Sequence, residues 1–401
     1  MTRPAADSQS LLLFAVVSLV WLRCAAARVR ALSYRSYSKA AMHETLVVDC
    51  SHPSCQQITH HLKHKNVEEL QLMDHSLRGD SSTDGVINAI KRAHPALLQN
   101  RFVTTNHFDI DSFLSVWCAL YPEEALAHQA LLSECSNIGD FRHLRLESDE
   151  HHRALKLACY LNSEERRLFY RPYEGSSSSY FGEDDAKFQH FLPVFLDVLR
   201  DTDAPQYEER FTEEYSRVVR EHGQILRDRR YSEHPSIGLV CVRLEEPGHY
   251  YPLFSVSRDF DIVLAIYSGN RYEVEIKYTT MVDLASRDCL PRVEMTELAQ
   301  RLNDLESAES PSEHRWIANR ITDSGPLLRL ESGARNLSKA ERYGHPSERP
   351  VYPSRIPPAD FEHIVISYFT HAYRGAAARR DWKWADLHQF NREIDWSQWT
   401  V

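Results

Sequence analysis

Val103-Thr104-Thr105-Asn106-His107-Phe108-Asp109-Ile110-Asp111-Ser112 is the stretch on which the expected fold of this chain depends. The residues from Arg101 to Thr105 form a short apolar and β-branched run that is typical of a buried strand. From Ser112 to Tyr121 (SFLSVWCALY) the apolar residues have helical spacing, and Pro122 ends the run. The stretch therefore predicts a strand, a polar turn and a helix, which is the repeating unit of a parallel sheet.

The neighbouring segments repeat this alternation. Thr45–Val48 is an apolar run followed by Asp49, and Glu69–Met73 is a second such run, followed by Asp74 and His75. A helical pattern that starts with an acid covers Asp84–Ala93. We therefore predict an α/β fold with a parallel-sheet N-terminal domain that carries helices on its faces.

The C-terminal half predicts a smaller α+β domain. The expected elements are helices at Phe188–Leu199, Tyr207–Leu226 and Met295–Leu305, strands at Ser236–Val242, Phe260–Tyr267 and Pro326–Glu331, and a hairpin at Ile262–Tyr278 with its turn at Ser268-Gly269-Asn270.

Five segments follow from these patterns. They are a targeting or disordered segment (1–42), an α/β domain with the candidate site (43–170), a Ser-rich acidic linker (171–185), an α+β domain (186–381) and a Trp-rich tail (382–401) expected to lie over the core.

The N-terminal segment allows three interpretations. Leu11–Leu22 is apolar but too short to span a bilayer, so it fits the core of a signal peptide. The following Arg-, Ala- and Ser-rich stretch fits an organelle transit peptide. Translation that starts at Met42 would instead leave the protein in the cytoplasm. The compartment therefore stays open, and no later segment predicts a membrane span.

Composition excludes several classes of protein. The 401 residues are 42% hydrophobic with a formal net charge of −10, which is unlike a nucleic-acid coat protein that needs a basic surface. The eight cysteines are scattered, which does not fit a disulfide scaffold. Cys50 and Cys55 with nearby histidines, among them His60 and His61, suggest zinc only weakly, because the histidines fall on a predicted helix.

The chemistry is expected where the predicted strands end. His107, Asp109 and Asp111 alternate after one strand, at the edge where open parallel sheets bind ligands. Two carboxylates and an imidazole suit a divalent metal, Mn²⁺ first and Mg²⁺ second. The alternative is that the acids only cap the helix. Asp49, Asp74 and His75 are further candidate ligands because they follow other predicted strands. Asp140 is another, because Gly139 before it would let the backbone approach closely.

A strand followed by H-x-D-x-D, a small residue and an apolar helix resembles the first motif of the DHH phosphoesterase superfamily. Through this resemblance His107, Asp109 and Asp111 are expected to hold two Mn²⁺-type ions on a parallel sheet. Asp74-His75 is similar to part of the Asp-His-His motif, with Ser76 in place of its second His. From about Glu44 to Phe369 the chain is also similar to an uncharacterised, bacterial-type family of unknown function.

These observations predict a metal-dependent hydrolase of phosphate esters or anhydrides. A phosphorylated small molecule or a short oligonucleotide is the expected substrate, and His75 or Asp111 is expected to assist proton transfer. Arginines in loop-like segments are expected to bind its phosphate, namely Arg292, Arg329 and Arg342. The alternatives are a non-catalytic protein that binds an anion and a structural protein. The oligomeric state stays open.

Overall fold

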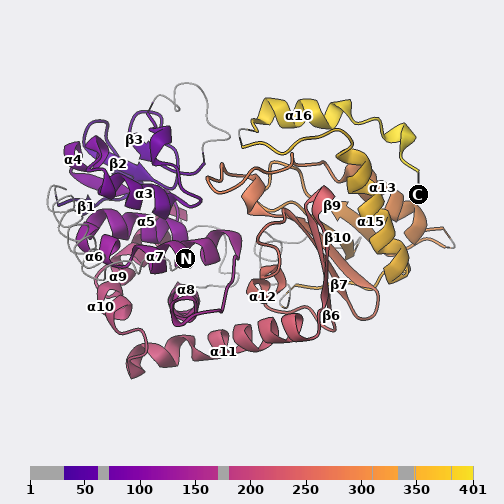
Figure 1. Cartoon of the computed structure of the whole chain (residues 1–401), viewed down its shortest axis with the longest axis horizontal. Helices are drawn as coiled ribbons and strands as arrows, with labels where there is room; N and C mark the ends of the chain where they lie inside the picture. Colours follow the sequence, from indigo (N-terminus) through magenta and orange to yellow (C-terminus); the bar gives the residue numbers. More distant parts are fainter. Residues whose placement is uncertain are drawn as a thin grey trace, which may run out of the picture. The chain divides into compact units, whose positions relative to one another are not determined.

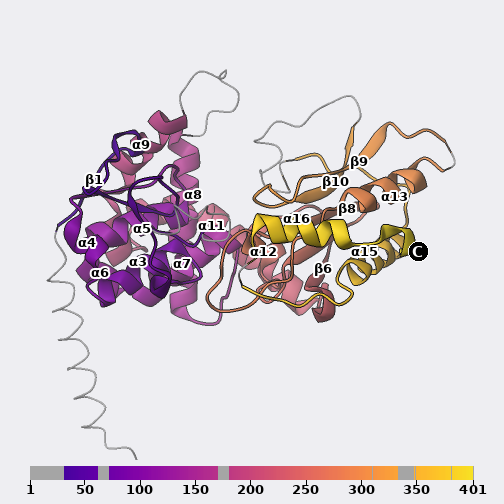
Figure 2. The ribbon, with the colours of Figure 1, turned by 90° about the horizontal axis from the view of Figure 1, so that it is seen from above.

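The computed structural model describes residues 31–61, 72–169, 180–308, 310–332, 347, 349–380 and 382–400. The chain divides into two compact units, drawn in Figures 1 and 2. The first unit comprises Met1–Ser136 and Glu165–Asp201. The second comprises Asn137–Glu164 and Thr202–Val401 and is the larger of the two. Each unit is therefore built from two separate stretches of the sequence.

The first unit contains a four-stranded sheet in the order β1-β4-β2-β3, in which every neighbouring pair is parallel. Its strands are β1 (Ser33–Tyr34), β2 (Thr45–Val48), β3 (Gln56–Ile58) and β4 (Phe102–Thr104). In the central strand β2 all four residues are buried, as expected for a parallel strand covered on both faces. The carboxyl ends of β2, β3 and β4 consequently meet at one edge of the sheet.

Short helices surround this sheet. They are α3 (Ser82–Lys91), α4 (Pro95–Gln99), α5 (Ile110–Leu120), α6 (Pro122–Ala127), the start of α7 (Gln129–Phe141), the end of α8 (Asp149–Phe169), α9 (Tyr180–Phe191) and α10 (Phe195–Arg200), with 3₁₀ turns η1 (Tyr37–Lys39) and η2 (His75–Leu77). The first turns of α3 and α5 are each fixed by a reciprocal capping box, Ser81 with Asp84 and Asp109 with Ser112.

Aromatic side chains attach α9 and α10 to this unit. Phe188 and Phe191 of α9 stack around Phe108, with ring centroids 5.2 and 5.3 Å away. Phe195 of α10 packs edge-on against Phe113 and Trp117 of α5. Such pairs contribute about 0.5–1.5 kcal/mol each beyond the burial of their area. They hold α9 beside the loop that follows β4.

The second unit is built on a mixed six-stranded sheet in the order β5-β6-β7-β8-β10-β9, in which only β6 and β7 are parallel to each other. Its strands are β5 (Tyr231–His234), β6 (Leu239–Leu244), β7 (Ile262–Tyr267), β8 (Arg271–Ile276), β9 (His314–Ala318) and β10 (Leu327–Ser332). β7 and β8 form the predicted hairpin, with Gly269 and Asn270 at positive φ in its turn.

Helices pack on both faces of this sheet. α13 (Thr296–Glu306) and α15 (Pro358–Ala372) lie beside each other over one core, which includes Leu264 and Val274 (Figures 1 and 2). α12 (Tyr250–Phe254) and the end of α11 (Pro205–Arg227) cover the opposite core. The 3₁₀ turns of this unit are η3 (Pro235–Ile237), η4 (Tyr278–Thr280) and η6 (Trp396–Gln398). The same strands therefore serve two hydrophobic layers.

The Trp-rich C-terminal segment lies on the core, as predicted. It contains α16 (Trp384–Glu393) and η6. Trp396 stacks on Tyr368 of α15 at a centroid distance of 4.4 Å, and the Trp399 indole donates a hydrogen bond of 3.1 Å to Ser367. Burial of these aromatic rings holds the segment down.

The predicted α/β class is confirmed, with a parallel sheet in one unit and a mixed sheet in the other. Three local predictions need correction. The predicted helix Phe188–Leu199 is two helices, α9 and α10, because Pro193 interrupts it. Residues 171–179 of the predicted linker lie outside the described residues. Its remaining part, 180–185, is helical, because α9 begins at Tyr180.

The predicted strand Glu69–Met73 falls mostly outside the described residues. Within them, Met73 makes one parallel bridge to Gln57. The strand that pairs with β2 is instead β3, which the hydrophobic pattern does not reveal because two of its three residues are glutamine. The N-terminal segment also lies outside the described residues up to residue 30. No helix among the described residues is both long and apolar enough to cross a membrane.

Candidate metal centre

Five side chains with metal-binding atoms meet at the carboxyl edge of the parallel sheet. Asp49 directly follows β2, His60 and His61 follow β3, and His107 and Asp109 follow β4. Asp49 has a positive φ of 53°, a backbone conformation that aspartate tolerates better than most residues. The polar groups therefore gather where parallel sheets generally place their ligands.

Asp49 is the centre of the cluster. Its Oδ1 atom lies 3.3 Å from the Nε2 atom of His60 and 3.3 Å from that of His61. Its Oδ2 atom lies 3.3 Å from the Nε2 atom of His107, which in turn is 3.1 Å from Asp109 Oδ2. Each oxygen of this one buried carboxylate thus faces a different set of ligands.

The cluster offers two groups of three ligands that share Asp49, one with His60 and His61 and the other with His107 and Asp109. Within each group the ligand atoms lie within 4.8 Å of one another. Atoms that coordinate a common ion at about 2.0–2.2 Å cannot be more than about 4.4 Å apart, so a small inward shift of the side chains suffices. The spacing fits a pair of ions bridged by the Asp49 carboxylate.

Hydrogen bonds orient two of the imidazoles with Nε2 toward Asp49. The Nδ1 atom of His60 lies 2.9 Å from the Asp80 carbonyl, and that of His107 lies 2.8 Å from Asn106 Oδ1. A carbonyl oxygen can only accept, so in each ring Nδ1 donates, and Nε2 is the atom that would bind a metal once its own proton is lost. Metal-ligating histidines are held in this way in most proteins.

The electrostatics of the cluster keep its carboxylates ionised. Burial would raise the pKa of Asp49, but hydrogen bonds with His107, His60 and His61 hold it well below its usual value. Burial would likewise lower the pKa of His107, but the Asp109 and Asp49 carboxylates raise it well above its usual value. Without a metal, the His107 imidazole is a positive charge that balances Asp49. A divalent cation would take over that role.

Asp111 lies directly behind the cluster and is fully buried. Its two oxygens accept hydrogen bonds of 2.8 and 2.9 Å from the backbone N–H groups of Ser82 and Thr83, in the first turn of α3. The Ser82 hydroxyl then donates a bond of 2.7 Å to Asp49. Burial and the Asp49 carboxylate raise the pKa of Asp111 to about 7. These contacts give Asp111 a positioning role behind the cluster, although His60 Nε2 lies 3.9 Å from one of its oxygens.

α9 places a lysine beside the loop that follows β4. Lys187 lies 5.5 Å from the centre of the Phe108 ring and is paired with Glu165 at 2.8 Å and Asp184 at 3.2 Å. Burial raises the pKa of Glu165, and the charge of Asp109 adds to this rise. The sequence patterns do not single out Lys187, because it lies far along the chain from the strand ends.

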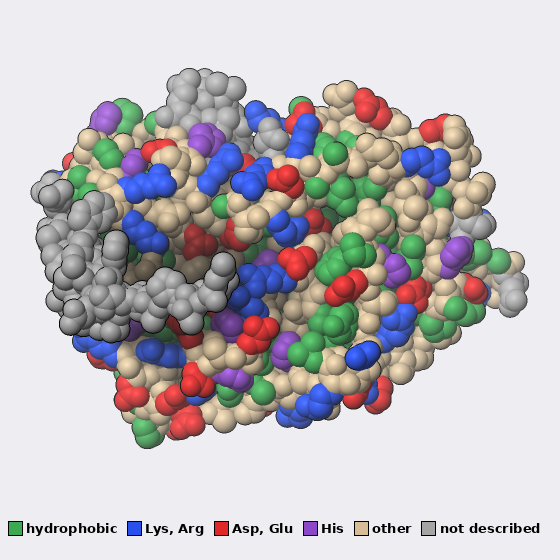
Figure 3. All heavy atoms as spheres, viewed as in Figure 1, with side chains coloured by type: hydrophobic (Ala, Val, Ile, Leu, Met, Phe, Trp, Pro, Cys, Tyr) green, Lys and Arg blue, Asp and Glu red, His purple; other side chains and the backbone are tan. Residues whose placement is uncertain are grey.

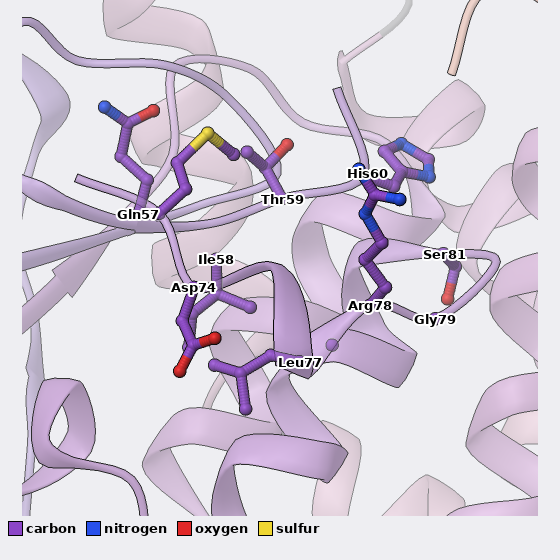
Figure 4. Close-up of a pocket in the computed structure, with 11 residues that line it drawn as sticks. Gln57, Ile58, Thr59, His60, Asp74, Leu77, Arg78, Gly79 and Ser81 are labelled. Atoms are coloured by element: carbon purple, nitrogen blue, oxygen red, sulfur yellow. The ribbon is translucent and has the colours of Figure 1, made fainter. Parts of the chain in front are cut away.

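The predicted ligands Asp74 and His75 are not part of this cluster. Asp74 caps η2 by accepting a hydrogen bond of 2.8 Å from the Ser76 N–H, and it pairs with His94. His75 contacts Arg78 instead. In Figure 4 the Asp74 carboxylate and the His60 ring lie at opposite ends of a small pocket. The chain turns into η2 at this point, which carries the two side chains away from the sheet edge.

Asp140 lies in the last turn of α7, and this part of the helix belongs to the second unit. Its carboxylate is one of the groups that could hold a metal ion, so Asp140 stays a candidate ligand.

The arginines predicted to bind phosphate are used internally. Arg292 is fully buried, and its guanidinium donates to the carbonyls of Ile321, Asp323 and Ser324. Arg329 is 3% exposed and pairs with Glu331. Both predictions are therefore wrong, since neither side chain is accessible to a substrate. Arg342 lies outside the described residues.

His60 and His61 are the candidate ligands that the sequence patterns do not place. The patterns put them on a helix and suggest only a zinc site with Cys50 and Cys55, whereas in the structure they lie just after β3. Two adjacent histidines after a strand would indicate ligands. The strand itself is not recognised from the pattern, because two of the three residues of β3 are glutamines. Both cysteines are buried free thiols.

On the visible face of the molecule, acidic and basic side chains are interspersed (Figure 3). This agrees with the absence of a general basic surface inferred from composition.

Comparison with known proteins gives one family. The model described as "Family of unknown function (DUF6687)" matches residues 30–380. No curated protein matches the chain.

Proposed function

Because the chain belongs to that family of unknown function, we propose from its site alone that the protein is a metal-dependent hydrolase of phosphate esters or anhydrides. The observation that supports this most is the placement of Asp49, one oxygen of which faces His60 and His61 while the other faces His107 beside Asp109. Mixed nitrogen and oxygen ligands favour Mn²⁺ over Mg²⁺, which prefers oxygen alone.

The residues of the site divide into ligands and supports. His60 and His61 with one oxygen of Asp49 would hold one ion, and His107 and Asp109 with the other oxygen would hold a second. When bound, such ions lower the pKa of a coordinated water and offset negative charge on phosphoryl oxygens. Ser82 holds the Asp49 carboxylate in place, and Asp111 holds the backbone of Ser82.

The exposed side of the cluster indicates where a substrate would enter. The Asp109 side chain is 45% exposed and that of His107 is 24% exposed, whereas Asp49 and His60 are nearly inaccessible. A phosphorylated small molecule or the end of a short oligonucleotide would therefore approach from the Asp109 side. Lys187 would supply positive charge there. The resemblance of the His107 motif to DHH phosphoesterases supports the same chemistry.

Metal content and turnover test this proposal. The full chain, Asp49→Asn and Asp74→Asn are each supplied with Mn²⁺, desalted and analysed for bound metal, then assayed with p-nitrophenyl phosphate, its diester and pyrophosphate. We expect about one or two ions per chain in the wild type and in Asp74→Asn, and none in Asp49→Asn. Hydrolysis should follow the metal. Asp74 is a suitable control because it is a carboxylate of the same unit outside the cluster.

Two outcomes would contradict the proposal. A wild-type protein without metal, even after Mn²⁺ is supplied, would remove the basis for any metal chemistry and favour a structural protein. Metal that is bound without hydrolysis of phosphomonoesters, phosphodiesters or pyrophosphate would favour a non-catalytic protein that binds an anionic ligand.

A further inference from the structure

The two ligand groups that share Asp49 differ in how far water can reach them. The inner group is Asp49 with His60 and His61, and the outer group is Asp49 with His107 and Asp109. In the inner group the side chains of Asp49, His60 and His61 are 2%, 1% and 20% exposed. In the outer group those of His107 and Asp109 are 24% and 45% exposed. An ion in the outer group would therefore stay in contact with solvent that the inner group largely excludes.

The donor atoms of the two groups differ as well. The inner group places two imidazole nitrogens beside one oxygen of Asp49. The outer group places one imidazole nitrogen, that of His107, beside carboxylate oxygens of Asp49 and Asp109. Imidazole nitrogen favours Zn²⁺- and Mn²⁺-type ions over Mg²⁺, whereas carboxylate oxygen accepts Mg²⁺ as well. The inner group should therefore bind its ion more tightly and discriminate against Mg²⁺.

The histidines of the two groups are oriented by different kinds of acceptor. The Nδ1 atom of His60 lies 2.9 Å from the backbone carbonyl of Asp80. The Nδ1 atom of His107 lies 2.8 Å from the side-chain oxygen of Asn106, its neighbour in the chain. A backbone acceptor is fixed by the fold, whereas a side chain can rotate away. The inner ring is therefore held in its ligand geometry more firmly than the outer one.

The carboxylates follow the same trend. The Oδ1 atom of Asp49, which faces the inner group, accepts a hydrogen bond of 2.7 Å from the Ser82 hydroxyl. One oxygen of Asp109 is used to cap α5, since it accepts a bond of 2.8 Å from the Ser112 N–H, and the other is turned toward the outer group. The outer group thus depends on a single oxygen of a half-exposed side chain.

A further oxygen lies beside the inner group. The Oδ2 atom of the fully buried Asp111 is 3.9 Å from the Nε2 atom of His60. Two atoms that bind one ion at about 2.0–2.2 Å can be up to about 4.4 Å apart, so this oxygen is within the range of a fourth ligand. Sites with four protein ligands are the closed type that holds a permanent ion, whereas three ligands leave a position open.

We propose that the two ions are not equivalent: the inner group retains a resident Zn²⁺- or Mn²⁺-type ion, and the outer group takes a second divalent ion from solution, which Mg²⁺ can replace. This inference rests on the proposed function, since it concerns the same site. The outer ion is the one that a substrate would reach from the Asp109 side. The concentration of free divalent cation therefore regulates the site, while the resident ion stays bound.

Metal retention tests this difference without an assay of activity. The full chain is loaded with Mn²⁺ and then dialysed against metal-free buffer or against excess Mg²⁺, and the bound manganese is measured at each stage. His61→Gln changes the inner group and Asp109→Asn the outer one. Asparagine also caps helices, so Asp109→Asn should leave the start of α5 intact. Asp74→Asn, outside the cluster, is the matched control.

We expect the wild type and Asp74→Asn to bind about two ions at high Mn²⁺ and to keep about one after either dialysis. The second ion should bind at least about tenfold more weakly than the first. Asp109→Asn should keep the resident ion and lose the exchangeable one. His61→Gln should keep none after dialysis. The wild-type measurements decide the question even if His61→Gln does not fold.

Several results would overturn the proposed difference and leave the hydrolase proposal standing. They are two ions retained equally, two ions lost together, displacement of both by Mg²⁺, a single ion at saturation, or loss of the resident ion in Asp109→Asn. One resident and one exchangeable ion without hydrolysis would uphold the difference and reject the hydrolase. A protein that binds no metal under any of these conditions would reject both.

Discussion

The Oδ2 atom of Asp111 accepts a hydrogen bond of 2.8 Å from the backbone N–H of Ser82. This bond joins the first turn of α5 to the first turn of α3, and Ser82 in turn donates to Asp49. Asp111, which the sequence marks as a metal ligand, thereby also holds the helix terminus that orients the cluster. It stays a candidate ligand as well, because one of its oxygens lies 3.9 Å from His60 Nε2.

Replacement of Asp111 should therefore lower stability as well as activity. Asp111→Ala leaves two buried N–H groups of α3 without acceptors, so we expect the free energy of unfolding to fall by about 2–4 kcal/mol in urea titrations. Asp74→Ala removes an exposed carboxylate that accepts one backbone N–H and pairs with His94, and it should cost only about 1 kcal/mol. Equal costs for the two variants would argue against the anchoring role of Asp111.

The two carboxylate oxygens of Asp49 have different neighbours, which predicts two metal sites that can be removed separately. His61→Gln should lose the ion held on the Oδ1 side and keep the other, and His107→Gln should do the reverse. Asp49→Asn should lose both. Metal analysis at increasing Mn²⁺ gives the number of ions bound by each variant. Loss of all metal in either histidine variant would indicate a single ion rather than a bridged pair.

Arg292 should prove essential for folding rather than for substrate binding. Its guanidinium donates to three backbone carbonyls and to the Thr280 hydroxyl, so Arg292→Met leaves several acceptors without this donor. We expect a loss of about 3 kcal/mol or more in unfolding free energy, measured by chemical denaturation. Arg243→Met, at an exposed ion pair with Glu362, should change stability by about 1 kcal/mol or less. A stable Arg292→Met protein with impaired substrate affinity would contradict this assignment.

Stability should depend on pH through Lys277. Its side chain is buried, which lowers its pKa to about 7 in the folded protein from about 10.5 when exposed, so between these values the unfolded chain binds more protons. Unfolding free energy should therefore rise with pH across this window. The rise should be on the order of a few kcal/mol in the wild type and absent in Lys277→Met. Thermal melts of both proteins from about pH 7 to about pH 10 measure the difference, and parallel curves would show that Lys277 is not buried in a neutral form.

The sequence predicts β2, β4, α3 and α5 of the first unit because each carries its own periodicity. Thr45–Val48 and Phe102–Thr104 are strands for the reason expected, namely apolar residues bounded by polar ones. Asp49, His107 and Asp109 are predicted correctly to converge, because the carboxyl ends of parallel strands share an edge.

The errors arise where contact depends on distant parts of the chain. β3 is recognised as a strand only through its pairing with β2, so the positions of His60 and His61 cannot be read from local pattern. Arg292 and Arg329 have polar neighbours in sequence but are enclosed by the second unit's own backbone and acids. Long-range burial of a charge leaves no local signature.

The division of the chain has a consequence for its synthesis. The first unit needs α9 and α10, which end near residue 200, although its sheet is complete by Thr104. A nascent chain that has passed Ser136 must produce Asn137–Glu164, which belongs to the other unit, before the phenylalanines of α9 can cover Phe108 and Phe113. During that interval an aromatic surface stays uncovered, so the folding of this protein on the ribosome should be most sensitive to chaperones between the emergence of residues 136 and 200.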